Sequence, residues 1–455
     1  MAAKLVIIRN DHPYSNPIRE ATIDSGKIRG TAGNNHTVTV FKGIPFAKPP
    51  VGELRFAKPQ PVEPWEGVRD CIEFGPAAFQ LDRSYEAGNG AKDLYPAPYK
   101  ISEDCLYLNV WTPAQSTDEK LPVYFWTHGG GNFGGFGHEM ENDGEGLAKR
   151  GVILVTYNYR LNCFGFLAHP ELSKENGGTS GNWAVYDAAM ALDWVRRNIS
   201  AFGGDPDNIT IGGQSAGCSM TMSLAVSPLA RGKYSKITYH SSVRIGKDGL
   251  DAKEALAEME EAGVKFMKAH GCNSIAELRA LPAEKLMEET EFEREFGLFR
   301  QFPDGVIIPK NVGEMLENGE YDDVPTLTCG TADEFLEDGQ KRQTVSKGVK
   351  AFCENQIKLG RKPVYAFRFS RDLPGDDEGA WHTSELFYLF ETVYRSWRPM
   401  RGYDYDISHM MADYWANFIK TGDPNGDGLP TWKPYTAESK KCMDLGTNDC
   451  MIDIK

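Results

Sequence analysis

The residues with the clearest chemical potential are those at 213–217, which read Gly-Gln-Ser-Ala-Gly. A β-prone segment at 208–212 precedes them, and a segment able to continue as a buried helix follows at 218–225. A Gly-x-Ser-x-Gly sequence between a strand and a helix is typical of a nucleophile elbow, a strained turn that exposes the serine hydroxyl. The first N–H groups of the following helix also favour negative charge formed beside the turn. We therefore predict that Ser215 is a nucleophile; the alternative is a chance spacing, because glycine makes up 47 of the 455 residues.

A second glycine-rich stretch, His-Gly-Gly-Gly at 128–131, follows the apolar run 121–127 directly. Consecutive glycines allow the backbone to turn several N–H groups into one concavity that holds negative charge. Together with the N–H after a nucleophilic serine, such a loop forms an oxyanion hole. The predicted donors are Gly130, Gly131 and Ala216, and a flexible turn is the alternative interpretation.

A nucleophilic serine needs a histidine base, and that base needs a carboxylate to orient it. The histidines downstream of Ser215 are His240, His270, His382 and His409. His382 lies in a glycine-containing loop between an expected strand and a helix, which suits a base. His240 ends the strand after the elbow and is the second candidate, whereas the other two lie in helical segments. For the acid, Asp333 and Glu334 both follow a strand that ends near residue 330.

The surrounding elements must bring these loops together. Short apolar runs predict buried strands at 121–127 and 152–157, and further strands are expected at 106–111, 236–239, 324–328 and 363–369. Helical spacing of apolar residues marks 183–199, and acidic, alanine-rich helices are expected over 252–290. Strands alternating with helices favour an α/β fold with a mostly parallel central sheet covered by helices on both faces. Ligands bind such sheets at the carboxyl ends of the strands, where Ser215 is expected.

Composition narrows the classes of function. With 41% hydrophobic residues and no evident linker, residues 1–455 are expected to form a single domain. The net charge of −14 disfavours nucleic acid as a partner. No apolar stretch is long enough to span a membrane, and the apolar run at the N-terminus is too short for a signal peptide. Nine cysteines without paired spacing suit a reducing compartment, so we expect a cytoplasmic protein.

Other candidate sites are weak. The segment 423–428 imitates the start of a calcium loop, but its twelfth position is Pro434 rather than glutamate, so a turn is expected. No zinc-protease, paired-cysteine or phosphate-loop motif occurs, and we predict neither a metal nor another cofactor. Four aromatic residues beside the catalytic loops are candidates for the substrate pocket, with core packing as the alternative: Phe133, Phe136, Trp381 and Phe387.

Several further segments, together with the elbow, resemble one family. They are 41–47 (FKGIPFA), 50–56 (PVGELRF), 103–109 (EDCLYLN), 157–161 (YNYRL), 202–206 (FGGDP), 304–305 (DG), 381–386 (WHTSEL) and 422–425 (GDPN). Over about residues 26–435 the chain resembles the type B carboxylesterases, which include para-nitrobenzyl esterases and cholinesterases. The resemblance implies an α/β-hydrolase fold, with Ser215 as nucleophile, Glu334 as acid and His382 as base. It also implies Gly130, Gly131 and Ala216 as the oxyanion donors, as predicted above from the sequence. The choice of Glu334 over Asp333 comes from the resemblance.

The chain departs from the family pattern in three places. The partner with which secreted members bond the cysteine at position 105 is missing from the segment 75–80, which leaves Cys71 as a substitute or Cys105 unpaired. The residue before the nucleophile is usually glutamate and here is Gln214. Glu334 and His382 lie only 48 positions apart, which implies a shortened helical cover and a more open cleft.

The expected function is therefore that of a serine carboxylesterase that hydrolyses short-chain esters through an acyl-serine intermediate. An esterase acting on acetylated or hydroxycinnamoylated plant polysaccharide is the alternative among enzymes. The alternative of another class is a non-catalytic adhesion or binding protein, against which the complete Ser–Glu–His set argues.

Overall fold

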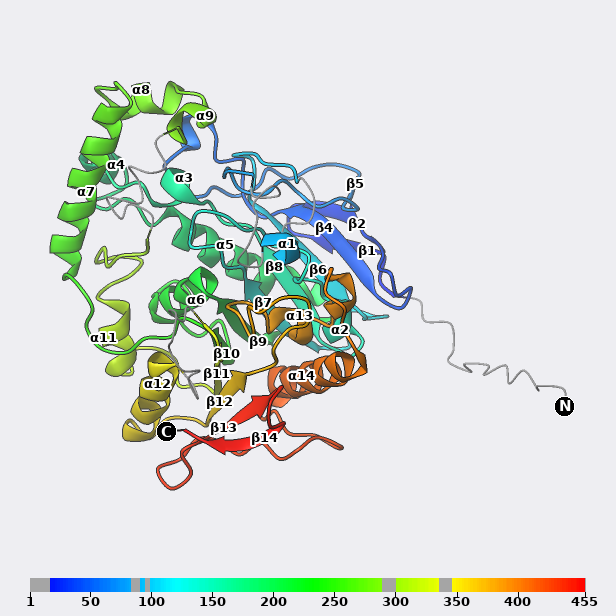
Figure 1. Ribbon diagram of the computed structural model, residues 1–455. Coiled ribbons are helices and arrows are strands. Elements are labelled where there is room, and N and C mark those ends of the chain that lie inside the picture. The colour runs from blue at the N-terminus through cyan, green and yellow to red at the C-terminus, as the bar shows by residue number, and fades with distance from the viewer. Residues whose placement is uncertain (1–16, 83–90, 95–98, 289–299, 335–345, 455) are drawn as a thin grey trace, which may run out of the picture.

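The computed structural model describes residues 17–82, 91–94, 99–288, 300–334 and 346–454 (Figure 1). Its centre is a large twisted sheet with helices on both faces, which confirms the predicted α/β-hydrolase architecture. The strands in spatial order are β14 (Cys450–Asp453), β13 (Lys441–Leu445), β12 (Val364–Phe369), β11 (Thr326–Thr331), β10 (Lys236–His240), β9 (Gly204–Gln214), β7 (Leu121–Thr127), β8 (Ile153–Tyr157), β6 (Tyr107–Thr112), β4 (Thr39–Pro45) and β3 (Thr31–Ala32).

The middle of this sheet is parallel. All pairs from β13 across to β8 run parallel, while β14, β6, β4 and β3 are antiparallel to their neighbours. A small separate sheet joins β1 (Glu20–Ile23), β2 (Gly26–Arg29) and β5 (Val68–Asp70). β8 is buried along its whole length, and its sequence is accordingly a largely apolar run rather than an alternating pattern. β10 is equally buried although it contains polar residues at both ends.

The central sheet separates two layers of core, and helices cover each layer. One layer contains side chains of α5 (Trp183–Asn198), α6 (Ala216–Val226), α7 (Ala252–Ala269) and α12 (Lys347–Lys358). The other contains α2 (Glu145–Ala148), α13 (Leu386–Leu389) and α14 (Gly402–Thr421). The remaining helices are α1 (Ala91–Leu94), α3 (Asn162–Phe166), α4 (Pro170–Glu175), α8 (Ile275–Ala280), α9 (Ala283–Leu286), α11 (Val312–Glu317) and the 3-10 turns η1 (Gly52–Leu54), η2 (Ile199–Phe202) and η3 (Val393–Arg395).

The observed elements follow the predicted ones, with shifts that have physical causes. The strand expected at 324–328 begins only at Thr326, because Pro325 before it has no N–H to donate to a ladder. The helical stretch expected over 252–290 is divided into α7, α8 and α9, and Gly271, with φ +71°, follows the first of them. Within the described ranges, we find no helix with the length and apolar character that crossing a membrane requires.

Candidate active site

Ser215 lies in the predicted strained turn between β9 and α6. Its backbone has φ 57° and ψ −123°, a region that residues with a side chain rarely occupy outside functional sites. Two glycines make the turn possible: a Cβ on Gly217 would lie 2.2 Å from the Thr127 carbonyl oxygen, and one on Gly213 would lie 2.4 Å from that of Gly217. The flanking residues must therefore be glycine, because strand and helix approach too closely for any side chain.

The His-Gly-Gly-Gly loop follows β7, the strand next to β9 in the sheet. Gly130 and Gly131 both have positive φ, at 96° and 66°, so the backbone turns sharply here. A Cβ on Gly130 would lie 2.1 Å from the carbonyl oxygen of Gly134. In the described part of the chain, the N–H groups of Gly130, Gly131 and Ala216 donate no hydrogen bond. These three groups are available to a ligand oxygen.

The structure brings His382 and Glu334 together and separates the two alternatives for the acid. His382 Nδ1 lies 2.8 Å from Glu334 Oε1, and both side chains are largely buried, with exposed fractions of 17% and 12%. Asp333 instead accepts the Ala380 N–H on Oδ2 at 2.8 Å and donates its own N–H to the Ala380 carbonyl oxygen at 3.1 Å. Asp333 thus ties the segment after β11 to the loop of His382, while Glu334 contacts the imidazole.

The loop that carries His382 is strained. Thr383 has φ +87°, which is rare for a β-branched residue and is found mainly where tertiary contacts impose it. With Ser215 and Asn132, Thr383 belongs to the few non-glycine residues with positive φ, and all three lie in or beside the loops that carry the proposed chemistry.

Gln214 makes a side-chain contact that could not be predicted from the sequence. Its side-chain Nε2 lies 3.1 Å from His382 Nε2, and the glutamine is buried. Because an amide N–H can only donate, the imidazole nitrogen accepts, which leaves Nδ1 protonated toward Glu334. This is the tautomer that a general base needs. A glutamate in place of Gln214 could not donate this hydrogen bond.

A cavity of about 510 Å³ opens over these groups. Its lining consists of Leu94, His128, Gly129, Gly130, Gly131, Glu139, Glu141, Asn142, Gln214, Ser215, Asp333, Glu378, Trp381, His382, Thr383 and Leu386. Of the four predicted pocket aromatics, the structure places only Trp381 at this cavity. Phe387 is fully buried on α13, Phe136 packs against Tyr99, and Phe133 is partly exposed. Adjacency in sequence did not reveal into which layer each ring turns.

Acidic side chains in the wall were not expected from the sequence. Glu141 is buried, and its Oε2 has no hydrogen-bond partner among the described residues. Burial, followed by the nearby charge of Glu139, raises the pKa of Glu141 well above its ordinary value. Its surroundings therefore favour the protonated form of the carboxyl. No motif marks it, because the spacing of single acids carries no signal.

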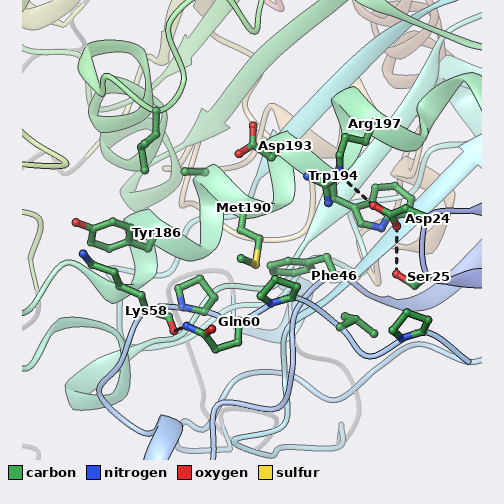
Figure 2. A pocket seen from close by; sticks show the side chains of 16 residues that line it. Asp24, Ser25, Phe46, Lys58, Gln60, Tyr186, Met190, Asp193, Trp194 and Arg197 are labelled. Atoms are coloured by element: carbon green, nitrogen blue, oxygen red, sulfur yellow. Dashed lines mark hydrogen bonds and ion pairs between the residues drawn. The ribbon is translucent and has the colours of Figure 1, made fainter. Parts of the chain in front are cut away.

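A larger cavity, of about 610 Å³, lies beside α5 (Figure 2). Phe46, Met190 and Trp194 line its apolar part, while Asp24 and Arg197 form an ion pair of 2.9 Å at one side. It contains none of the predicted catalytic side chains. Ser215 and His382 line the smaller cavity instead.

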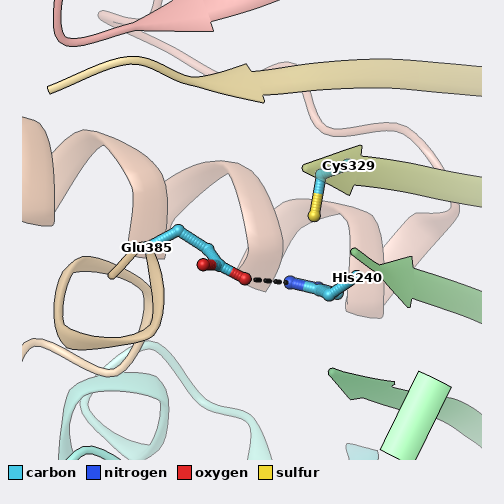
Figure 3. Close-up of side chains that lie close together, drawn as sticks. All are labelled: His240, Cys329 and Glu385. Carbon is cyan, nitrogen blue, oxygen red and sulfur yellow. Dashed lines mark hydrogen bonds and ion pairs between the residues drawn. The ribbon is translucent and has the colours of Figure 1, made fainter. Parts of the chain in front are cut away.

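His240, the second candidate for the base, does not face Ser215. Its Nδ1 lies 3.3 Å from Glu385 Oε1, and both side chains are fully buried (Figure 3). With Cys329 they form the one cluster of described residues whose ligand atoms are close enough to hold a metal ion. However, the Trp415 indole N–H donates to His240 Nε2 at 3.3 Å, which places the ring proton on Nδ1 toward Glu385. A metal on Nδ1 would force two N–H groups to face each other, so this cluster does not suit one.

The cysteines bear on the predicted compartment. None of the nine described cysteines forms a disulfide, and eight of them are buried. Cys71 and Cys105, the pair considered above, are both buried and unbonded. Burial raises the pKa of the Cys71 thiol to about 11, which makes it an unreactive group at neutral pH.

Comparison with known proteins gives a consistent result. The chain is 38% identical to a fumonisin B1 esterase of Sphingopyxis macrogoltabida over 68% of its length, although it spans only 55% of that relative. It is 32% identical to the para-nitrobenzyl esterase of Bacillus subtilis, with 93% of this chain and 94% of the relative aligned.

Solved structures agree with these relatives. A para-nitrobenzyl esterase superimposes with a TM-score of 0.81 at 30% identity, covering 95% of this chain and 96% of the other. A carboxylesterase of Geobacillus stearothermophilus gives 0.79 at 28% identity, with 96% and 98% covered. The profile of the Carboxylesterase family matches residues 17–358 and 343–455. The chain therefore belongs to the carboxylesterase family, and its relatives are hydrolases of carboxylic esters.

Proposed function

We propose that this protein is a serine esterase in which Ser215, His382 and Glu334 form the catalytic triad. The observation that carries the proposal is the hydrogen bond from His382 Nδ1 to Glu334, made while His382 and Ser215 line the same cavity. The elbow, the free N–H groups of the glycine loop and the family all support this reading. An adhesion protein would need none of these groups arranged around a cavity.

In the proposed mechanism, His382 Nε2 takes the Ser215 proton as Oγ attacks the ester carbonyl carbon. Glu334 holds the imidazole in the correct tautomer and stabilises the imidazolium that forms. The N–H groups of Gly130, Gly131 and Ala216 bind the oxyanion, and each such donor contributes about 3–4 kcal/mol in comparable sites. The imidazolium then protonates the leaving alcohol. Water repeats the attack on the acyl-serine and releases the acid.

The strain at Ser215 and Thr383 supports the same assignment. Each residue holds a backbone conformation that costs on the order of 1–3 kcal/mol and persists only where the surrounding structure imposes it. Ser215 is the proposed nucleophile itself, and Thr383 directly follows the proposed base His382. Backbone strain of this kind is typical of active sites.

For the substrate, we propose short-chain acyl esters, including those of bulky alcohols. The alignment with the Bacillus subtilis esterase spans 483 positions, more than the 455 residues of this chain, so the relative carries insertions that this chain lacks. A reduced cover leaves fewer apolar contacts for a long acyl chain. A para-nitrophenyl series from acetate to palmitate tests this, and a rate that peaks at palmitate would contradict it. Feruloyl and acetyl-sugar esters in the same panel test the polysaccharide alternative.

The triad is tested with a fluorophosphonate probe, which labels activated serines. Ser215→Ala should abolish both labelling and hydrolysis while the far-ultraviolet circular dichroism stays unchanged. Ser223→Ala is the matched control, because Ser223 lies on α6 but its hydroxyl donates to the Ser219 carbonyl oxygen. Hydrolysis that survives in Ser215→Ala would refute the assignment.

We also propose that the protein acts in the cytoplasm. Its nine cysteines, none of which forms a disulfide, support a reducing environment.

A further inference from the structure

The carboxyl ends of three adjacent strands present a row of side chains to the loop that carries the proposed base. In the parallel register, Gln214 on β9 pairs with His240 on β10, and His240 pairs with Cys329 on β11. Paired residues on parallel strands point to the same face of a sheet. The row therefore runs across the sheet from β9, which precedes the proposed nucleophile, to β11, which precedes the proposed acid.

Two members of this row reach the base loop at positions three residues apart. Gln214 contacts His382 at 3.1 Å, and His240 contacts Glu385 at 3.3 Å (Figure 3). His240 also holds the elbow directly, because its carbonyl oxygen accepts the Ser215 N–H at 2.9 Å. One residue thus links the backbone of the nucleophile to the segment of the base.

The orientation of the His240 ring is determined at both nitrogens. Trp415 on α14 donates to Nε2 at 3.3 Å, so Nδ1–H donates to Glu385. The ring of Trp126 lies against His240 edge-on, with centroids 5.2 Å apart. The imidazole cannot rotate without breaking these contacts, and it is shielded from solvent.

Stability alone does not account for this pair. Glu385 is fully buried, and its second oxygen has no hydrogen-bond partner among the described residues. A buried polar group that lacks a hydrogen-bond partner costs free energy, which a packed apolar group in its place would not. A costly pair at the junction of the nucleophile strand and the base loop is more consistent with a geometric role.

We infer that His240 and Glu385 are positioning residues that hold the loop of His382 in register with Ser215. This inference rests on the proposed triad. Neither side chain touches the substrate; the pair determines where the imidazole stands relative to the serine hydroxyl. A misplacement of about 1 Å in such a contact can lower a rate by about 100-fold.

The test compares variants in the full-length protein by kcat and KM for para-nitrophenyl acetate and by the rate of fluorophosphonate labelling. His240→Phe removes both hydrogen bonds and should lower kcat and labelling about 10-fold or more, with KM nearly unchanged. His240→Gln can donate to Glu385 and accept from Trp415, so it should restore most of the lost rate. Glu385→Gln keeps the acceptor and should behave like His240→Gln.

Ile237→Ala is the matched control, because Ile237 lies on the same strand but packs in the core layer on the opposite face. It should lower the melting temperature without lowering kcat at 25 °C. A His240→Phe protein with normal kcat would overturn the inference, as would an Ile237→Ala protein that loses kcat equally. A Glu385→Gln variant as slow as His240→Phe would also overturn it.

The two proposals can fail separately. If Ser215→Ala still hydrolyses esters, the triad itself is wrong. If Ser215→Ala is inactive while His240→Phe is fully active, only the positioning role is wrong.

Discussion

The contact between Gln214 and His382 leads to a prediction with a definite sign. In Gln214→Glu, a carboxylate oxygen replaces the amide nitrogen that lies 3.1 Å from His382 Nε2. A negative charge at this distance favours the protonated imidazole, so the base loses its proton only at higher pH. The acid limb of the pH dependence of kcat/KM should therefore move upward.

The size of the shift follows from Coulomb's law. Two unit charges 3.1 Å apart interact by about 1.3 kcal/mol even at the dielectric constant of water, equivalent to about one pH unit. Because Gln214 is buried, the effective dielectric constant is lower, and one unit is the minimum expected. On the acid side, the variant should thus be at least about 10-fold slower, while the two proteins converge at alkaline pH.

The assay is kcat/KM for para-nitrophenyl acetate from pH 5 to 9, with the buffer rate subtracted. Gln214→Met is the matched control, since it keeps the length of the side chain but adds no charge; its acid limb should stay within about 0.3 unit of the wild type. An acid limb that does not move in Gln214→Glu would refute the contact between residue 214 and the base. Equal shifts in both variants would show that the effect is not electrostatic.

Three further predictions follow from other parts of the structure. Burial lowers the pKa of His128 from 6.5 to about 4, so the unfolded chain binds the proton more readily and stability falls as the pH drops from about 6.5 toward 4. Between pH 7 and 5, the free energy of unfolding measured with urea should fall by about 2 kcal/mol more for the wild type than for His128→Phe, which keeps a ring stacked on Tyr159. An equal fall in both proteins would contradict this. Gly217→Ala should abolish activity or folding, because its Cβ would lie 2.2 Å from the Thr127 carbonyl oxygen, and an active, stable variant on a thermal melt and an ester assay would show that the elbow is looser than described. Titration of thiols in the denatured protein should give nine with or without reductant, and a lower count before reduction would reveal a disulfide and speak against the cytoplasm.

Local sequence determined much of the architecture. Strands buried on both faces of the sheet tend to be apolar throughout, so the largely apolar β7 and β8 could be located from their residue pattern. The elbow and the glycine loop could also be predicted, because each needs glycine at fixed positions for steric reasons. That residues 1–455 form a single domain stays a prediction.

The tertiary structure decided every choice between residues far apart in the chain. Asp333 and Glu334 are neighbours in sequence, and only the placement of the 380–382 segment shows that one binds Ala380 and the other His382. His240 ends β10 and His382 follows β12, but the parallel register directs the His240 ring to Glu385. The Gln214 contact joins residues 168 positions apart. Such pairings depend on which face each side chain takes and which loops meet at the sheet edge, and no local pattern of residues encodes either.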